Sequence, residues 1–359
     1  MKVTLVAHYL DESVGHGMDR YSLKLMQGLR GKGVTVNPVS SPAVLLGPPK
    51  SFLDFFFYLP LRTIMRLGPG DLFHFTAPQA GLAIPVVKRI FGKKVVTTIY
   101  DLHPFIDKGQ KSSFPVRKAL ETAIKSSDML LVISSQTKRD ILRLFKVDEK
   151  KIRVTLLAAD GKFQPSAEKK KAGGKPQGIA PQGGARVFTV GYIGGFAPYK
   201  NVPFLIRAYS IFEKKCKTPC RLLLYGKGPE YQGCIRLAKE LGAKGVEFRG
   251  FADEKDIVGI FNSFDVFVFP SNAEGFGLPI IEAQMCGVPV IVKEGAHVPE
   301  EVTEMCLKAK GEERLASLLE KVRSEGFVFS KGHLDYLKRF TWDDCIERTI
   351  AAYEDVLKG

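Results

Sequence analysis

The sequence of 359 residues lacks several features that would place it in other classes of protein. It has no run of eighteen apolar residues. Its most apolar stretch, residues 52–67, is interrupted by Asp54, Pro60 and Arg62, which excludes an ordinary membrane-spanning helix. The first residues show neither the basic flank nor the small-residue cleavage site of a secretory signal. We therefore expect a cytoplasmic protein.

Cysteine is scarce, and none of the six cysteines belongs to a C-x-x-C pair. Around Cys216 and Cys220 there is no second cysteine pair or histidine cluster that would complete a zinc site, and the sequence contains no Asp-x-Asp motif. We expect free, reduced cysteines, no bound metal and no other cofactor.

The positive charge is confined to one part of the chain. The formal net charge of +15 divides into +11 in residues 1–160, +5 in residues 161–186 and −1 in residues 187–359. Such a distribution indicates that the N-terminal half meets an anionic partner. The sequence has no zinc finger or RNP-like aromatic motif, so nucleic acid is not the partner we expect.

Apolar runs of strand length alternate with segments of helical period, for example residues 18–30 and 135–145, which predicts parallel sheets covered by helices. In the first half the expected strands are residues 3–7, 34–37, 71–75, 95–98, 129–133 and 152–154. In the second half they are residues 187–192, 221–224, 246–248, 265–269 and 288–292.

The composition also predicts where one domain ends and the next begins. Residues 166–186 are rich in Lys, Gly, Pro and Gln and almost free of apolar residues, which is typical of a linker. We expect an N-terminal domain over residues 1–165, a second domain over 187–340 and a closing helix over 341–359. Two open sheets in tandem bind ligands at the carboxyl ends of their strands, in the cleft between the domains.

The most informative stretch is the loop of residues 270–279, Pro-Ser-Asn-Ala-Glu-Gly-Phe-Gly-Leu-Pro, between a buried strand and a helix over 280–286. Its glycines allow the backbone to approach a ligand, and the helix N-terminus favours phosphate oxygens. Glu274 and Glu282 are eight residues apart, so both carboxylates can point at one ligand and accept hydrogen bonds from vicinal hydroxyls. The alternative is a loop whose acid merely caps the helix.

This loop resembles the signature of the family 4 glycosyltransferases, retaining enzymes of the GT-B fold, which has two Rossmann-like domains. The resemblance implies an α/β fold with an inter-domain cleft and a last helix, opening at Thr341, that crosses back to the first domain. It implies that Glu274 contacts the donor hexose and Glu282 the nucleotide ribose. The resemblance also implies that the donor contacts Gly275, Phe276, Gly277 and Leu278 of this loop.

Two shorter segments of the second half are similar to the same family. After the strand at 187–192, Gly194 and Gly195 precede Lys200, to which the resemblance assigns the diphosphate and hence a catalytic role. Many members carry an Arg where this chain has Gly195 and Phe196, so a second side-chain cation is in question. Gly226 lies in a turn that borders the nucleotide in the family.

The first half is similar at two loops on the acceptor and sugar side. Gly15 and Gly17 lie between the first strand and the first helix, like a family loop near the diphosphate and acceptor, although a plain helix start is the alternative. Tyr100 stands before Asp101 where the family commonly has a sugar-contacting His, and His103 follows. Either Tyr100 or His103 could face the sugar.

The resemblance thus implies metal-independent, retaining transfer of a hexose from a GDP-mannose-like or UDP-hexose donor to a glycan or lipid-phosphate-linked acceptor. The alternatives are a nucleotide-sugar epimerase or a phosphorylase of the same fold, a non-catalytic nucleotide-sugar sensor, and a nucleic-acid-binding protein. The aromatic stretch 52–62, followed by Arg66, fits either the core of the first domain or peripheral attachment to an anionic membrane surface.

Overall fold

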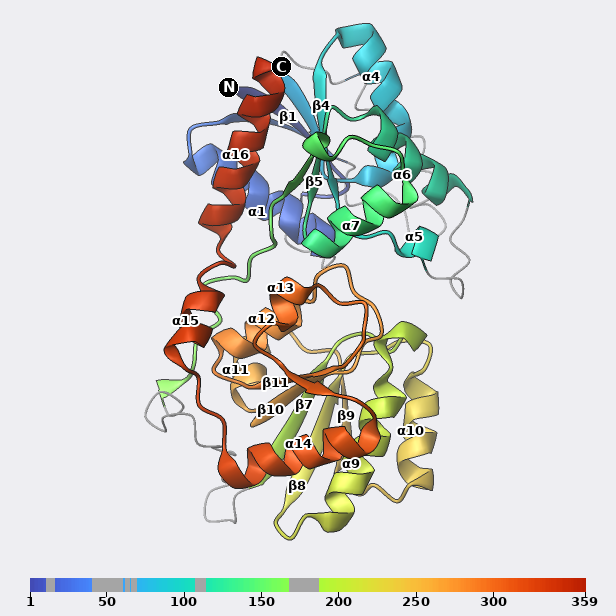
Figure 1. Ribbon diagram of the computed structural model, residues 1–359, viewed down its shortest axis with the longest axis vertical. Helices are drawn as coiled ribbons and strands as arrows, with labels where there is room; N and C mark the ends of the chain where they lie inside the picture. The colour runs from blue at the N-terminus through green and yellow to red at the C-terminus, as the bar shows by residue number, and fades with distance from the viewer. Residues whose placement is uncertain (11–16, 41–60, 62–64, 66–69, 107–113, 168–186) are drawn as a thin grey trace. The chain divides into compact units, whose positions relative to one another are not determined.

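The chain forms two compact units, each built on its own parallel sheet (Figure 1). The computed structural model describes residues 1–10, 17–40, 61, 65, 70–106, 114–167 and 187–359, apart from the side chain of His103. Unit 1 contains residues 1–158 and 341–359, and unit 2 contains residues 159–340. The division lies before the expected linker because Phe163 packs on Phe261 and the Ser166 N–H donates to Asn262 Oδ1 at 2.8 Å, both within unit 2.

The sheet of unit 1 has the order β2-β1-β3-β4-β5-β6, with parallel pairing throughout the described strands. Its strands are β1 (Lys2–Ala7), β2 (Thr35–Ser40), β3 (Leu72–Phe75), β4 (Lys94–Ile99), β5 (Met129–Val132) and β6 (Ile152–Val154). The central strands are buried on both faces, which explains their nearly continuous apolar runs. Pro38 is tolerated in β2 because β2 has only one neighbour among the described strands.

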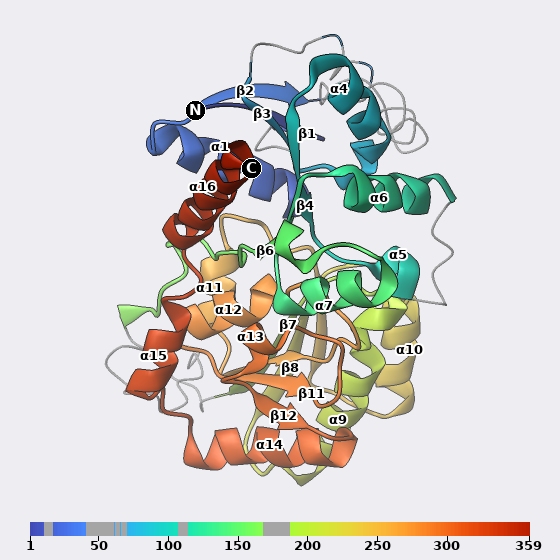
Figure 2. The ribbon, with the colours of Figure 1, turned by 45° about the horizontal axis from the view of Figure 1, so that its top comes forward.

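Helices cover both faces of this sheet, with α1 and α16 side by side on one face and α4 and α6 on the other (Figures 1 and 2). The helical segments are α1 (Gly17–Gly31), η2 (Pro78–Ala83), α4 (Ile84–Phe91), α5 (His103–Ile106), α6 (Phe114–Ser126), α7 (Ser135–Leu144), η3 (Glu149–Lys151) and α16 (Trp342–Lys358). Thr341 caps α16 by accepting a hydrogen bond from the Asp344 N–H at 3.3 Å.

The last helix belongs to unit 1 although the chain reaches it only after unit 2. It packs so closely on α1 that a Cβ at Gly28 would lie 1.9 Å from Ile346 Cδ1. A buried polar contact joins it to the sheet, since Tyr353 Oη lies 2.6 Å from His74 Nδ1 and His74 Nε2 lies 2.8 Å from Thr98 Oγ1. The predicted return of the closing helix to the first half of the chain is thereby confirmed.

The sheet of unit 2 has the order β12-β11-β10-β7-β8-β9 and is also parallel. Its strands are β7 (Phe188–Ile193), β8 (Cys220–Tyr225), β9 (Val246–Gly250), β10 (Val266–Phe269), β11 (Val290–Lys293) and β12 (Leu307–Ala309). The chain turns outward from β7 in one direction through β8 and β9, and in the other through β10 to β12. The topological switch point, where open α/β sheets bind ligands, therefore lies between β7 and β10.

The helices of unit 2 also cover both faces, with α9 and α10 on one side of the sheet and α11 and α12 on the other (Figure 1). The helical segments are η4 (Pro198–Lys200), α9 (Val202–Lys215), α10 (Tyr231–Glu240), α11 (Ile257–Asn262), α12 (Leu278–Met285), α13 (Glu300–Thr303), α14 (Glu312–Glu325) and α15 (Lys331–Leu337). Within the described ranges, no helix has both the length and the apolar character needed to cross a bilayer.

Every strand that the sequence predicts is present, with ends displaced by three residues or fewer. The pattern does not predict β12, because a three-residue strand interrupted by Lys308 is too short to show alternation. The predicted Gly15, and the aromatic stretch at 52–62 except Leu61, lie outside the described residues.

Candidate active site

Two loops of unit 2 meet at its switch point and bring together an ion pair. Lys200 ends η4, which follows β7, and Glu274 lies in the loop that follows β10. Their side chains are 2.7 Å apart from Nζ to Oε1 and only 17% and 13% exposed. The sequence places these residues 74 positions apart, and the neighbouring position of β7 and β10 brings them into contact.

The Lys200 ammonium has an unusually aromatic environment for a charged group. It lies 5.2 Å from the centre of the Tyr199 ring and 5.7 Å from that of Phe269. The negative charge of Glu274 also acts on Tyr192 below it. Burial, with a smaller contribution from Glu274, raises the pKa of Tyr192, whose neutral hydroxyl donates to the Gly195 carbonyl at 2.6 Å. Lys200 and Glu274 therefore form a partly desolvated charged pair, and the nearby Tyr192 hydroxyl is neutral and held by a hydrogen bond.

Backbone hydrogen bonds hold the Glu274 loop against its neighbours on both sides. On the β7 side, the Asn272 N–H donates to the Tyr199 carbonyl at 2.7 Å. On the β11 side, Ala273 forms an isolated parallel bridge with His297, and the Glu274 N–H donates to the His297 carbonyl at 2.9 Å. The position of Glu274 is thus fixed by two neighbouring segments of the chain, one at Tyr199 and one at His297.

The predicted glycines Gly194 and Gly226 lie where two turns approach closely, and this approach requires a glycine at position 226, whereas a Cβ at Gly194 would lie 2.7 Å from the Tyr192 hydroxyl. A Cβ at Gly226 would lie 1.8 Å from the Gly194 carbonyl oxygen, and Gly226 has a φ of 131° that other residues rarely adopt. The Gly194 N–H donates to the Tyr225 carbonyl at 3.0 Å. The carboxyl ends of β7 and β8 therefore leave backbone, rather than side chains, at this edge of the sheet.

The glycine-rich part of the loop leads directly into α12. Gly277 has a φ of 102° and is the residue before the helix, which begins at Leu278. The Phe276 side chain is buried and faces the Phe340 ring at 6.0 Å, so at this position only the backbone is available to a ligand. Glu282 is the fifth residue of α12, half-buried, and Gly275 is likewise partly exposed.

The residues predicted for the acceptor and sugar side lie in unit 1, on separate segments of the chain. Gly17 is the first residue of α1, and no atom lies within 4 Å of the position of a Cβ there. The Tyr100 hydroxyl donates to the Thr76 carbonyl at 2.9 Å, and burial raises the pKa of Tyr100, so its proton is committed to the protein itself. Asp101 is half-buried beside it, and His103 begins α5.

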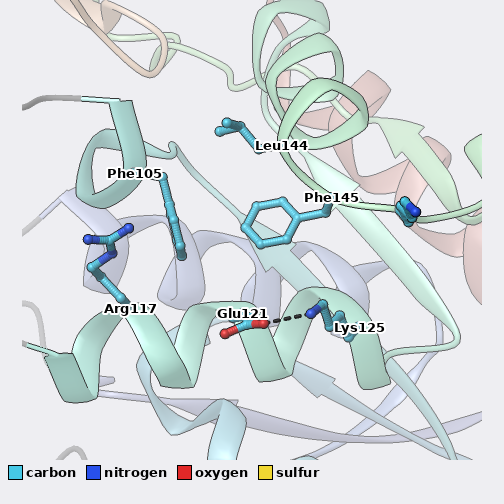
Figure 3. Close-up of a pocket in the computed structure, with 7 residues that line it drawn as sticks. Phe105, Arg117, Glu121, Lys125, Leu144 and Phe145 are labelled. Atoms are coloured by element: carbon cyan, nitrogen blue, oxygen red, sulfur yellow. Dashed lines mark hydrogen bonds and ion pairs between the residues drawn. The ribbon is translucent and has the colours of Figure 1, made fainter.

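Unit 1 also has a hollow of about 460 Å³ that involves no residue predicted from the sequence (Figure 3). Phe105 and Phe145 form its apolar wall at 5.1 Å between ring centres, and the Arg117 guanidinium lies 5.0 Å from the Phe105 ring. Glu121 and Lys125 pair at 2.6 Å along α6. The hollow therefore lies on the outer helices rather than at the carboxyl edge of the sheet.

Four polar residues around the ion pair are absent from the sequence-based prediction. Asn201 is the only described non-glycine residue with positive φ, at 54°, and its amide reaches the Glu274 loop. Asn272 Oδ1 accepts from both Asn201 Nδ2 and Lys293 Nζ, and His297 supplies the backbone bridge. The one available signal is Asn201 itself, because Asn is among the few residues that tolerate a left-handed conformation.

Comparison with known proteins covers both units. Residues 184–322 match the family model described as glycosyl transferases group 1, and residues 15–156 match that of glycosyltransferase family 4. The O-antigen chain mannosyltransferase B of Escherichia coli is 30% identical over 274 residues, covering 73% of this chain and 70% of that protein. A D-inositol 3-phosphate glycosyltransferase of Stackebrandtia nassauensis is 27% identical over 256 residues, 66% of this chain and 56% of that protein.

Two solved structures match almost the whole length of the chain. Sucrose-phosphate synthase from Thermosynechococcus elongatus has a TM-score of 0.75 at 19% identity, with 99% of both chains covered. Anabaena HepE, solved in complex with UDP and glucose, has a TM-score of 0.72 at 15% identity, with 99% of this chain and 100% of that chain covered. At these identities the likeness concerns the fold alone.

Proposed function

Because the chain belongs to the family 4 glycosyltransferases and has their GT-B fold, we propose that it transfers a hexose from a nucleoside diphosphate sugar with retention of anomeric configuration. The acceptor in this proposal is a glycan or a lipid-phosphate-linked sugar. The observation that carries the proposal is the Lys200–Glu274 pair at the switch point of unit 2, with Glu282 on the helix that follows.

Breaking the bond between hexose and phosphate creates positive charge on the sugar and negative charge on the departing diphosphate. Lys200 supplies the cation for the diphosphate, and the backbone from Gly275 to Leu278 supplies N–H donors at a helix N-terminus. Glu274 accepts hydrogen bonds from the hexose, and Glu282 accepts them from the ribose. Retention then follows from attack on the face that the diphosphate leaves, with the diphosphate assisting deprotonation of the acceptor.

The donor in this proposal is GDP-mannose-like or a UDP-hexose. Similarity to a mannosyltransferase supports the first, and similarity in fold to a protein solved with UDP and glucose supports the second. The proposed reaction uses no metal ion, because Lys200 and the N–H donors at the start of α12 supply the positive charge for the departing diphosphate.

The direct test is a transfer assay with a panel of GDP- and UDP-hexoses, together with titration calorimetry of each donor. We expect one base and one hexose to give both binding and transfer, with activity maintained in EDTA and an anomeric product signal in NMR that matches the donor. Binding without transfer to any glycan or lipid-linked acceptor would indicate a sensor. Transformation of the hexose while it remains attached to the nucleotide would indicate an epimerase.

The acceptor side of the proposal rests on unit 1 and its excess of positive charge. Leu82, Val86 and Ile90 recur every four residues along η2 and α4 and are 39%, 38% and 59% exposed, with the exposed Arg89 beside them. An apolar stripe with cations fits an anionic lipid surface.

Co-sedimentation with anionic vesicles should weaken with salt and with Ile90→Ser, but not with Phe251→Ser, which changes an exposed aromatic of unit 2. Equal binding to neutral vesicles, or no binding to either kind of vesicle at low salt, would contradict attachment of unit 1 to an anionic lipid surface.

A further inference from the structure

Two asparagines join the loops that carry the proposed catalytic side chains. Asn201 directly follows Lys200, and its Nδ2 donates to the Pro270 carbonyl at 3.3 Å and to Asn272 Oδ1 at 3.4 Å. Asn272 in turn precedes Glu274 by two residues, and its N–H donates to the Tyr199 carbonyl at 2.7 Å. The two loops are therefore connected through the residues on both sides of Lys200 and through a part of the other loop that precedes Glu274.

Asn201 does not serve the role that its position in the fold would suggest. It is the residue before α9, where an asparagine side chain ordinarily accepts a hydrogen bond from its own helix. Here the side chain makes no capping hydrogen bond, and its amide donates to the neighbouring loop instead. The backbone is left-handed, with φ 54° and ψ 37°, a conformation that asparagine tolerates better than most other residues with a side chain. Both features favour a function in the link between the loops over one in the helix.

Asn272 extends the link to a third strand. Its Oδ1 accepts from Lys293 Nζ at the end of β11 as well as from Asn201 Nδ2, and its carbonyl accepts from the His297 N–H at 2.7 Å. Asn272 is exposed, so these contacts add little to burial. These contacts instead fix the position of the part of the loop from which the Glu274 side chain extends.

We propose that Asn201 and Asn272 are positioning residues for hexose transfer, which act by holding Lys200 and Glu274 at the spacing that a nucleoside diphosphate hexose requires. This inference rests on the proposed function. Catalytic groups must stay close to their productive geometry, and small displacements reduce turnover more than they reduce substrate binding.

Two variants remove the link with little disturbance of the backbone. Asn201→Gly retains the left-handed conformation and loses only the amide, whereas Asn272→Ala loses the Oδ1 acceptor. We expect each to lower kcat by about 5- to 10-fold while donor KM changes by less than about 2-fold. Asn272→Asp, which keeps an oxygen acceptor, should restore most of the activity.

The dependence on the ion pair is tested by a double-mutant comparison. If Asn201 acts through Lys200, Asn201→Gly should cause no further loss of kcat/KM when it is added to Lys200→Ala. The matched control is Asn262→Ala, since Asn262 also links backbone segments of unit 2, accepting from the Ser166 N–H and donating to the Gln164 carbonyl at 3.0 Å. It should lower the melting temperature without lowering kcat. A full additional loss in the Lys200→Ala background, or an equal loss of kcat in Asn262→Ala, would overturn the proposal.

Hydrogen exchange separates this inference from the proposed function. Without substrate, the amides of Asn272 and Glu274 should exchange faster in Asn201→Gly than in the wild type, because the loop that carries these donors is no longer held by the Asn201 amide. If the wild type transfers hexose, and Asn201→Gly shows the same amide exchange and the same turnover as the wild type, the positioning role alone is overturned. A wild type that transfers no hexose from any donor would overturn the proposed function, and the positioning role with it.

Discussion

Each unit has a polar cluster at its sheet, and the two clusters differ in charge and in exposure. In unit 1, His74, Thr98 and Tyr353 form a fully buried network of neutral groups. In unit 2, Lys200 and Glu274 form a charged pair that retains contact with solvent. A buried neutral network can satisfy itself and stabilises one arrangement. A charged pair that keeps some contact with solvent can exchange one of its partners for a charged ligand. The buried network therefore has the properties of a structural cluster, and the charged pair has those of the catalytic cluster that we propose.

The largest expected effect follows from removing one member of the charged pair. Lys200→Ala and Glu274→Ala should lower kcat by about 100- to 1000-fold, because their contacts strengthen in the transition state, and the protein should stay folded, although the remaining charge of a largely buried pair loses its partner. Tyr353→Phe is the matched variant of the other cluster, for which stability should fall and kcat should not. Single-turnover rates of wild-type magnitude in either alanine variant would remove that residue from the catalytic assignment.

A smaller effect is expected from the second glutamate. Glu282→Ala removes a charged acceptor from a half-buried position without opening a core cavity. Loss of one hydrogen bond to a charged group corresponds to about 1.5–3 kcal/mol, so donor affinity should fall by roughly 10- to 150-fold while the protein stays folded. Calorimetry with the preferred donor measures this directly. An unchanged affinity would show that Glu282 does not contact the ribose.

The buried network of unit 1 makes stability depend on pH. Burial lowers the pKa of His74 to about 3, whereas the imidazole of the unfolded chain titrates near 6.5. Between these values the unfolded chain binds more protons, so the free energy of unfolding decreases as the pH falls below 6.5. At about pH 5 the free energy of unfolding is lower by roughly 2 kcal/mol because of His74. Urea unfolding at neutral pH and near pH 5 should show this loss in the wild type and a smaller one in His74→Gln. An equal loss in both proteins would contradict it.

The sequence predicts the parts of this molecule that depend on local pattern. The strands follow from apolar runs, and Glu274, Glu282 and Lys200 follow from the motif in which they lie. What it does not predict is that β10 pairs with β7, because strand order depends on contacts between distant segments. The contact between Lys200 and Glu274 is a consequence of that order.

Local pattern misses the residues whose contacts lie on distant segments of the chain. Asn272 occupies a position of the loop that its own sequence context leaves unassigned, and its contacts lie on two other strand ends. Tyr100 is the opposite case, a residue that the motif assigns to the site and whose contact in the fold differs from that assignment. The motif proposes it for the sugar, and only the fold shows that its hydroxyl donates to Thr76. In both cases the deciding partner is more than 20 residues away or on a different loop.

The contact between Lys200 and Glu274 has a consequence for the end of a catalytic cycle. A partly desolvated ammonium left without a counterion would retain a dianionic product strongly, and release would then limit turnover. In the transfer proposed here, Glu274 returns to Lys200 once the hexose and the nucleoside diphosphate have left. The carboxylate thus acts as an internal counterion that competes with the leaving product for Lys200. The charge of Lys200 is then balanced in the enzyme before the next donor binds.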